Sequence, residues 1–268
     1  MRDVDVLDEF GGTRRISIPA ERALTVFVDK RELVTLMTLG AAPELLVMGY
    51  LRNQRLVDSV HDIESISVDW DVHAAAVKTR AGIERFDEKT AKRVVTTGCG
   101  QGTVFGDLMG ELDTLHLPGA SDPRARLSQG TLYALLNAMR LQESTYKSAG
   151  SVHGCALFRA GELLTFVEDV GRHNAIDTIA GWMWLHGIDG ADKIFYTTGR
   201  LTSEMVIKSA QMSVPIVVSR SGITQMGLEL AHKLGLALFG RATNRHFICY
   251  CGFERFDSEP EPARSPGV

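Results

Sequence analysis

The sequence predicts an α/β protein in which a layered domain of strands and helices follows a smaller, mostly β part. From residue 152 onward, short apolar runs of strand length alternate with longer runs of helical character. That alternation is typical of a layered domain with a mainly parallel sheet. Up to about residue 115, apolar and polar residues alternate singly, which favours half-buried strands. We therefore expect an N-terminal domain (1–120), an α/β domain (121–256) and a tail (257–268).

In the first part, Asp29-Lys30-Arg31 is expected to be the turn of a hairpin between two apolar strands. The next apolar run has a proline near its start, which predicts a short helix. Single apolar residues then alternate with polar ones, as in half-buried strands. The expected elements are strands at 23–28 and 32–36, a helix at 42–51, strands between 60 and 77, and a brief strand at 94–97.

In the second part, Ser128 is a predicted helix N-cap, since its hydroxyl can accept a bond from a first-turn amide. Ala160-Gly161-Glu162 is expected to be the turn between two strands. The expected elements are a helix from 128 to about 143, strands at 152–158 and 163–167, a helix at 175–186, a strand at 193–197, a helix at 203–212, a strand at 215–219, a helix at 225–234, and strands at 236–239 and 246–250.

The composition, with 44% hydrophobic and 23% charged residues among 268, is that of an ordinary globular protein. A formal net charge of −4 argues against a general nucleic-acid-binding surface. No apolar run approaches the roughly 20 residues that cross a bilayer, and the acidic start lacks the apolar core of a signal peptide. We expect a cytoplasmic protein without nucleic-acid or membrane partners. The tail is rich in Pro, Glu and Ser, which predicts disorder.

Polar and charged residues follow four of the predicted strands. If these strands are parallel, the segments meet at one edge of the sheet, where open α/β sheets bind ligands. Arginine and helix-start amides both favour phosphate, so the pattern indicates a pocket for a phosphorylated ligand of nucleotide size. Any single loop is more simply explained by ordinary turn and helix-cap residues, and Thr202 and Asn174 can each be such a cap. Four such loops in succession favour the pocket. The residues are Glu168, Asp169, Gly171, Arg172 and His173; Thr198, Gly199, Arg200, Thr202, Ser203 and Glu204; Ser219, Arg220, Ser221 and Gly222; Gly240, Arg241, Thr243, Asn244 and Arg245.

Cys99 stands between Gly98 and Gly100 in a glycine-rich loop. Glycine frees the backbone, so this thiol can be carried out to a partner as a nucleophile or sulfur carrier, although a cysteine in an ordinary turn is equally compatible. Cys155 is expected in the core. Cys249 and Cys251 are expected to share one strand face, because side chains alternate along a strand. A zinc site with Cys99 and His173 is disfavoured, since no C-x-x-C pair is present, and we expect no metal.

Four longer motifs are similar to those of the FdhD family of sulfur carriers, or sulfurtransferases, that active formate dehydrogenase requires. They are Val-Glu-Asp-Val-Gly-Arg-His-Asn-Ala-Ile-Asp (167–177), Thr-Gly-Arg-Leu-Thr-Ser-Glu-Met-Val (198–206), Pro-Ile-Val-Val-Ser-Arg-Ser (215–221) and Leu-Glu-Leu-Ala-His-Lys-Leu-Gly-Leu (228–236). The resemblance covers about residues 20–256 and implies a cytidine-deaminase-like α/β domain, a smaller N-terminal domain and a homodimer.

The resemblance further implies that a cysteine desulfurase passes a persulfide to Cys99. The sulfur would then go to the molybdenum (or tungsten) cofactor, bis-molybdopterin guanine dinucleotide, before that cofactor enters formate dehydrogenase. The family's cofactor-binding segment would fall on Phe247, Ile248, Cys249, Tyr250, Cys251 and Gly252. Arg172, His173, Arg200 and Ser203 are the expected cofactor contacts at the strand ends.

One departure from the family pattern concerns the glycine loop, where Gly102 stands in place of a second cysteine. Cys99 would then act alone. The departure also motivates a second hypothesis, in which the chain is a chaperone that binds and delivers the cofactor without moving sulfur. A zinc-dependent hydrolase is a third reading. Deamination is not implied, because the chain has neither the H-x-E nor the P-C-x-x-C of zinc deaminases.

Overall fold

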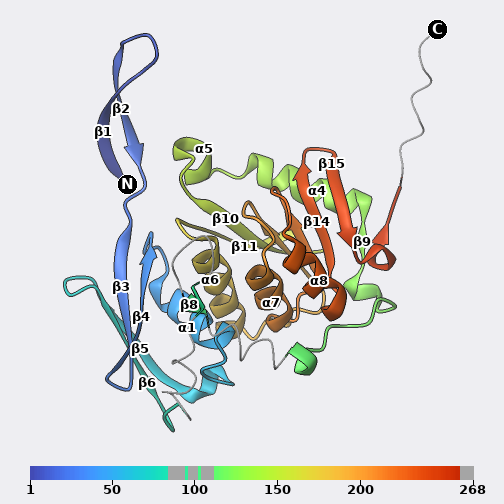
Figure 1. Cartoon of the computed structure of the whole chain (residues 1–268), viewed down its shortest axis with the longest axis horizontal. Coiled ribbons are helices and arrows are strands. Elements are labelled where there is room, and N and C mark those ends of the chain that lie inside the picture. Colours follow the sequence, from blue (N-terminus) through green and yellow to red (C-terminus); the bar gives the residue numbers. More distant parts are fainter. Residues whose placement is uncertain (84–93, 96–101, 104–111, 260–268) are drawn as a thin grey trace.

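The computed structural model describes residues 1–83, 94–95, 102–103 and 112–259. Among these residues, the N-terminal part contains a projecting hairpin, a four-stranded sheet, the helix α1 and a pair of short strands (Figure 1). The elements are β1 (Arg2–Leu7), β2 (Thr13–Ile18), β3 (Arg22–Val28), β4 (Arg31–Thr38), α1 (Pro43–Asn53), β5 (Ile63–Asp69), β6 (Ala74–Thr79), β7 (Val94–Val95) and β8 (Gly102–Thr103).

The four-stranded sheet has the order β4-β3-β6-β5. The predicted hairpin between β3 and β4 is confirmed, and Asp29 and Lys30 have the positive φ angles (47° and 71°) that tight hairpin turns require. The predicted helix is also confirmed as α1, with Pro43 in its first turn. Leu46, Val47 and Tyr50 of α1 are buried with strand residues of this sheet, so α1 covers its inner face.

The remaining elements form a layered α/β unit. They are β9 (Leu127–Ser128), α4 (Gln129–Leu141), α5 (Thr145–Ala149), β10 (His153–Arg159), β11 (Glu162–Asp169), α6 (Arg172–Leu185), β12 (Lys193–Thr197), α7 (Ser203–Gln211), β13 (Ile216–Ser219), α8 (Gln225–Leu234), β14 (Ala237–Thr243), β15 (His246–Cys251) and β16 (Phe256–Asp257). Ser128 caps α4 as predicted, accepting a bond of 3.1 Å from the Thr131 amide.

The six-stranded sheet has the order β11-β10-β12-β13-β14-β15 and is mixed. The expectation of a mainly parallel sheet is wrong, since only β12–β13 and β13–β14 are parallel neighbours. Parallel neighbours need a long crossover connection. The short turn at Ala160 and Gly161 therefore makes β10 and β11 an antiparallel hairpin, and a second short turn does the same for β14 and β15. Nevertheless β11 and β12 are both antiparallel to β10, so β11 to β14 run in one direction and end at one edge.

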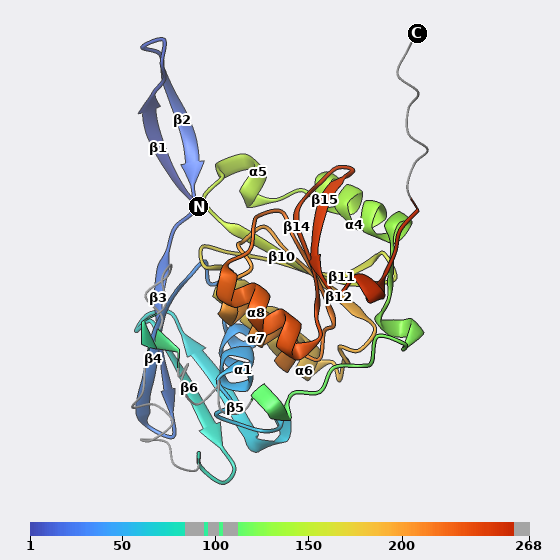
Figure 2. The same ribbon diagram turned by 45° about the vertical axis from the view of Figure 1, so that its right-hand side comes forward.

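Helices cover both faces of this sheet (Figures 1 and 2). On one face, Leu132, Leu135 and Leu136 of α4 pack against strand residues such as Phe158 and Phe239. On the other, α6, α7 and α8 form a second buried cluster with the strands. The two faces and their separate cores make this a layered α/β unit, as the sequence predicts. A cytidine-deaminase-like arrangement of its layers stays a prediction, as do the boundaries of the two domains.

The two parts of the chain meet where α1 crosses α6. A Cβ atom on Gly49 would lie 1.7 Å from the Asp177 carbonyl oxygen, and one on Gly181 would lie 2.0 Å from that of Leu45. The helix backbones therefore touch directly. Beside the crossing, the buried Asp177 carboxylate accepts bonds from Asn53 (2.7 Å) and Lys208 (2.8 Å), which ties α1, α6 and α7 together.

The first three residues of the predicted disordered tail are ordered. Asp257 lies in β16, which pairs with β9, and its carboxylate is bonded to Arg126. The Glu259 amide donates to Gln129 at 3.0 Å. These contacts hold residues 257–259 against the sheet domain, and residues 260–268 lie outside the described part. Within the described residues, every helix is too short or too polar to traverse a lipid bilayer.

Candidate functional site

The carboxyl ends of β11 to β14 and the amino end of β10 lie at one edge of the six-stranded sheet, as the strand directions require. Two of the loops at this edge touch. A Cβ atom on Gly199 would lie 2.9 Å from Cδ of Arg172, so only glycine leaves room for the arginine side chain there. The structure thus brings together the segments after β11 and β12, as the sequence analysis expects.

Asp169, the last residue of β11, is buried and braces this edge. Its Oδ1 accepts bonds from the Gly171 amide (3.0 Å) and Asn174 Nδ2 (2.7 Å), and its Oδ2 from Thr38 Oγ1 (2.5 Å) and the Leu39 amide (3.1 Å). Burial raises the pKa of the Asp169 carboxyl, and these four donors oppose that shift. With its oxygens engaged in this way, Asp169 anchors the N-terminal sheet to the start of α6.

The helix after β11 starts at Arg172, three residues before the predicted start at Ala175. Gly171 occupies the N-cap position, and Asn174, which was considered as a cap, instead bonds Asp169 and the Met37 carbonyl oxygen (2.7 Å). Arg172 and His173 therefore belong to the first helical turn and are buried, 4% and 2% exposed.

His173 faces a buried carboxylate on the neighbouring helix. Its Nε2 lies 3.3 Å from Glu204 Oε2, and both side chains are almost fully buried. Burial lowers the pKa of His173 to about 3, although the Glu204 charge opposes that shift. The imidazole is therefore neutral at physiological pH. Among the described residues, its Nδ1 has no hydrogen-bond partner.

Thr198, which follows β12, lies next to the start of β10. Its Oγ1 accepts a bond from the Gly154 amide (3.1 Å) and lies 3.4 Å from His153 Nδ1. Burial lowers the pKa of His153, and the charges of Arg172 and Arg200 lower it further. Arg172 and Arg200 therefore lie near enough to His153 at the strand ends to oppose its protonation.

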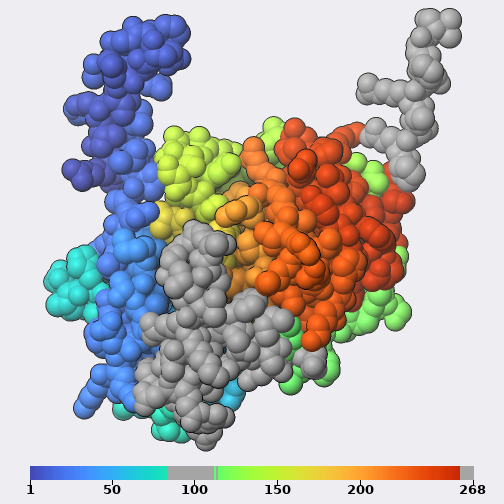
Figure 3. Space-filling view, in the orientation of Figure 1, coloured from blue at the N-terminus to red at the C-terminus, as the bar shows by residue number. Residues whose placement is uncertain are grey.

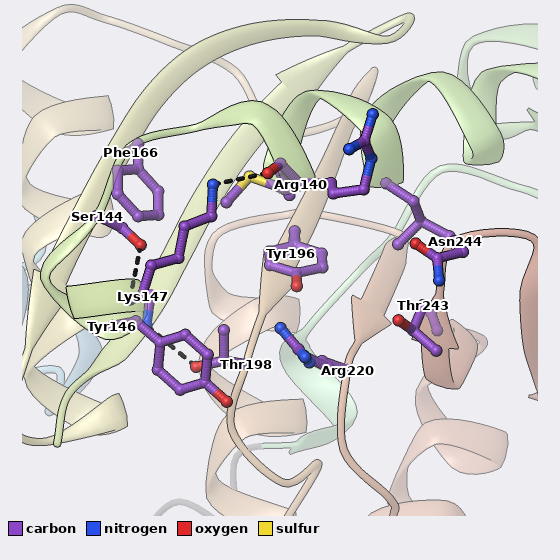
Figure 4. Close-up of a pocket in the computed structure, with 14 residues that line it drawn as sticks. Arg140, Ser144, Tyr146, Lys147, Phe166, Tyr196, Thr198, Arg220, Thr243 and Asn244 are labelled. Atoms are coloured by element: carbon purple, nitrogen blue, oxygen red, sulfur yellow. Dashed lines mark hydrogen bonds between the residues drawn. The ribbon is translucent and has the colours of Figure 1, made fainter. Parts of the chain in front are cut away.

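A cavity of about 210 Å³ opens at the α4 side of this edge (Figure 4). Three cationic side chains and three aromatic rings line it, and none of its described lining residues is Asp or Glu. The polar and aromatic lining residues are Arg140, Ser144, Tyr146, Lys147, Phe166, Tyr196, Thr198, Arg220, Thr243 and Asn244.

The short helix α5 forms one wall of the cavity, and Glu168 holds it in place. The two Glu168 carboxylate oxygens accept bonds from the Thr145 amide (2.7 Å) and the Tyr146 amide (2.8 Å). The Lys147 ammonium donates to the Arg140 carbonyl oxygen at 2.6 Å, as Figure 4 shows. The Arg220 guanidinium lies 5.5 Å from the centre of the Tyr146 ring. The acid after β11 thus fixes the cation-bearing segment above the strands.

These features suit an anionic, partly planar ligand. Arginine and lysine bind phosphate oxygens, and aromatic faces stack on planar rings. Burial raises the pKa of Tyr196 to about 12, so its phenol stays protonated and can donate a hydrogen bond. The cavity is smaller than the about 300–1,000 Å³ typical of complete small-molecule sites, so it suits one end of a larger ligand.

Comparison with known proteins identifies the family. The family model described as FdhD/NarQ matches residues 19–257. This chain belongs to the FdhD/NarQ family. It is 31% identical over 235 residues to a protein of Bacillus pumilus named "Sulfur carrier protein FdhD", a match that covers 88% of each chain. A Listeria monocytogenes protein of the same name is 28% identical over 240 residues, covering 89% of this chain and 91% of the relative.

The fold also matches a solved structure. A putative formate dehydrogenase accessory protein from Desulfotalea psychrophila superimposes with a TM-score of 0.76 at 24% sequence identity, covering 96% of this chain and 98% of that one. At this level of identity the match establishes the shared fold. The FdhD/NarQ assignment itself rests on the family model and the sequence relatives.

The four strand-end residues expected as cofactor contacts are not among the described residues that line the cavity. Arg172 and His173 are in the buried first turn of α6, Ser203 begins α7, and Arg200 is exposed in the loop after β12. Of the five arginines expected at the edge, Arg220 lines the cavity. Ligand contact by Arg172, His173, Arg200 and Ser203 stays a prediction.

The segment from Phe247 to Gly252 forms β15, at the end of the sheet, and the turn after it. Phe247 packs edge-on against Phe239 and Phe256. Gly252 has φ 73°, and a Cβ there would lie 2.4 Å from Ala237 Cα, so this position requires glycine. These contacts give Phe247 and Gly252 a packing role. Cofactor binding by Phe247, Ile248, Cys249, Tyr250, Cys251 and Gly252 stays a prediction.

Cys249 and Cys251 do not share a strand face, contrary to the expectation. Cys249 packs with the α4-side core and Cys251 with the α6-side core. The reason is a β-bulge, because Phe239 pairs with Cys249 and Leu238 with Cys251, leaving Tyr250 as the extra residue that reverses the alternation. Burial raises the pKa of Cys249 to about 12 and that of Cys251 to about 11. Both thiols are therefore protonated and poor nucleophiles.

Cys155 lies in the core as predicted, and burial raises the pKa of its thiol to about 12. In the described part of the chain, no group of three His, Cys, Asp or Glu side chains is arranged to hold a metal ion. Cys99 falls within 96–101, outside the described residues, between β7 and β8, which pair with each other.

The α5 wall of the cavity was not predicted from the sequence. It contributes Arg140, Ser144, Tyr146 and Lys147, in and around a five-residue helix too short to show a hydrophobic period. A local indication was present, because Ser144 is a good N-cap residue directly after the predicted end of the preceding helix. The Lys147 amide indeed donates to Ser144 Oγ at 3.3 Å.

Proposed function

We propose that this chain is a sulfur carrier for formate dehydrogenase. It would accept persulfide sulfur from a cysteine desulfurase on Cys99 and pass it to the molybdenum cofactor, bis-molybdopterin guanine dinucleotide. Membership in the FdhD/NarQ family over residues 19–257 carries this proposal. Relatives named as sulfur carriers and the fold match to a formate dehydrogenase accessory protein support it.

The chemistry at Cys99 would run in two steps. In the first, the Cys99 thiolate attacks the outer sulfur of a desulfurase persulfide; the donor sulfur–sulfur bond breaks as a new one forms, and the donor leaves as a thiolate. No net oxidation takes place. In the second, release of the carried sulfur as sulfide needs two electrons. A thiol reductant outside the chain would supply them, because Gly102 replaces a second loop cysteine and the other three cysteines have raised pKa values.

The cavity supports the cofactor part of the proposal. A guanine dinucleotide arm ends in a planar base and carries a pyrophosphate, which matches aromatic rings and three cations without a carboxylate. We propose that Arg140, Lys147 and Arg220 hold the phosphates there. The rest of the cofactor would extend across the strand ends past Thr198 toward His173, whose neutral imidazole can donate or accept a hydrogen bond. The proposal includes a cytoplasmic location and a homodimer.

The test is genetic complementation. A strain that lacks its own carrier receives the wild-type chain, Cys99→Ser or the control Cys155→Ala, whose core thiol has a raised pKa. We expect formate dehydrogenase activity with the wild type and the control, and loss of most activity with Cys99→Ser at equal protein levels. Full activity with Cys99→Ser would refute sulfur transfer through this thiol.

One observation favours a second function, that of a cofactor-binding chaperone. Gly102 removes the second loop thiol, whereas the cationic cavity is intact. A chaperone would tolerate Cys99→Ser and lose activity with Arg220→Ala. The same complementation strain separates the two functions, since a sulfur carrier requires both residues.

A further inference from the structure

The N-terminal hairpin, β1 and β2, stands away from the rest of the molecule in both ribbon views and in the space-filling view (Figures 1, 2 and 3). It also lies outside residues 19–257, which match the family model. A two-stranded hairpin alone is marginally stable in water. Leu7 and Phe10 near its tip are 73% and 89% exposed. The hairpin therefore carries apolar surface that nothing in the described part of this chain covers.

The two faces of the hairpin differ in chemistry. Cross-strand partners share a face, and the register pairs Val4 with Ile16, Arg2 with Ile18, and Val6 with Arg14. This face has four β-branched apolar side chains at its centre and an arginine at each end. Ile16 and Ile18 are 37% and 36% exposed. We call it the hairpin face.

The opposite side of the hairpin is polar apart from Leu7, and its side chains bond one another. Arg15 Nε lies 2.9 Å from Asp5 Oδ1, and Ser17 donates to Asp3. By contrast, the described residues provide no ion-pair partner for Arg2 or Arg14 on the hairpin face. The two arginines and the four β-branched side chains thus lie together on the hairpin face.

A second surface, which the described residues leave uncovered, lies on the four-stranded sheet, on the side opposite α1. The register aligns Thr35, Thr25, Ala74 and Asp69 in one row, and Glu32, Phe27, Ala76 and Ser67 in the next. We call these two rows, together with Ala23 and Met37, the sheet face. Its centre consists of small or apolar side chains, Met37 is 45% exposed, and an acid stands at either edge. The nearby Lys78 is neutralised by Glu64 at 2.7 Å.

We propose that the hairpin face of one copy of this chain packs on the sheet face of a second copy. The apolar centres match, and Arg2 and Arg14 on one surface complement Glu32 and Asp69 on the other. Two such sheets can pack face to face about 10 Å apart with aligned strands. Only residues 19–21 separate β2 from β3, and the hairpin extends beyond the end of its own sheet, so the occupant is the other copy's hairpin (Figure 1). A two-fold exchange makes the contact twice and so doubles its area.

The test measures the molar mass of the full chain by light scattering coupled to size exclusion, from about 1 to 100 μM. Ile16→Asp puts a charge in the hairpin face, and Thr13→Asp puts the same charge on the opposite side of the same strand as a control. Because Ile16→Asp can simply unfold the hairpin, Ala76→Arg alters the sheet face independently. It adds an exposed cation that repels Arg2 and Arg14.

We expect the wild type and Thr13→Asp to be dimers, and Ile16→Asp and Ala76→Arg to dissociate at least tenfold more readily. A monomeric wild type at 100 μM would overturn the proposal, as would dimers of unchanged strength in both variants. In a mixed sample, a copy with Ile16→Cys and a copy with Ala76→Cys should form a disulfide-linked heterodimer. Absence of that heterodimer would equally refute the exchange. None of these outcomes depends on sulfur transfer, so this contact and the sulfur-carrier role can fail separately.

Discussion

Arg220 offers the sharpest test of the cavity. It lies after β13, reaches to 5.5 Å from the centre of the Tyr146 ring and lines the cavity with Arg140 and Lys147. A hydrogen bond to a charged group contributes about 1.5–3 kcal/mol, and solvent reduces that value for the exposed Arg220. We therefore expect the loss of the Arg220 side chain to weaken ligand binding by about 1–1.5 kcal/mol, which raises the dissociation constant roughly 5- to 12-fold.

The assay is isothermal titration calorimetry with GDP, which carries the base and pyrophosphate of a guanine dinucleotide arm. Arg220→Ala is compared with Arg159→Ala, which removes the same charge at the opposite end of β10, where Arg159 pairs with Asp192 at 3.1 Å. We expect the loss of affinity only for Arg220→Ala, and a smaller loss at high salt because screening weakens the contact. Equal affinities for Arg220→Ala and the wild type would refute the assignment of this cavity as the phosphate site.

Three further predictions concern the frame that holds the site. Gly49→Ala should destabilise the fold by more than about 3 kcal/mol in urea denaturation, because its Cβ would lie 1.7 Å from the Asp177 carbonyl oxygen. The control Gly130→Ala has no neighbour nearer than 3.9 Å to its Cβ and should stay within about 1 kcal/mol of the wild type. Lys208→Met should cost about 3–5 kcal/mol, because it leaves the buried Asp177 carboxylate without its cation; a loss below 1 kcal/mol would contradict that pairing. Folding lowers the pKa of His173 from about 6.5 to about 3, so the stability that its neutral form contributes is complete above pH 6.5 and declines as the pH falls toward 3. Between pH 7.5 and pH 5, the free energy of unfolding of the wild type should therefore fall by about 2 kcal/mol more than that of His173→Gln. Parallel pH curves for the two proteins would exclude a buried neutral imidazole.

Local patterns in the sequence predict most elements of this fold correctly. Asp29-Lys30 and Ala160-Gly161 mark tight hairpin turns by residue type, and Ser128 marks the start of α4. The direction of neighbouring strands is harder to predict, because it depends on connection length as well as on strand pattern. The same short turn that was predicted between β10 and β11 already required an antiparallel pair and contradicted a mainly parallel sheet.

Other features depend on contacts between distant residues. The bulge at Tyr250 separates Cys249 from Cys251, and it depends on the pairing with β14. The early start of α6 depends on Asp169, whose donors include Thr38 from the N-terminal sheet. Neither partner is visible in the local sequence. The convergence of the strand ends was predictable because it follows from strand direction, whereas the α5 wall was not, because a five-residue helix has no periodicity.

The N-terminal hairpin was not predicted either, although its own sequence contains the pattern. Val4 and Val6, and then Ile16 and Ile18, alternate with polar residues on either side of Gly11-Gly12, which is a recognisable hairpin pattern. The segment is short and highly charged, and the charges obscure the period of two. The exposed apolar face that results is also the feature that distinguishes this hairpin from an ordinary charged terminus.

The most direct test of sulfur transfer is the intact mass of the protein after incubation with a cysteine desulfurase and cysteine. The wild type should gain one sulfur atom, the gain should disappear on reduction, and Cys99→Ser should show no gain. That result would identify Cys99 as the persulfide carrier and show that Gly102 is no obstacle. No gain in the wild type, with a desulfurase of demonstrated activity, would contradict the sulfur-carrier account and favour the cofactor-binding chaperone.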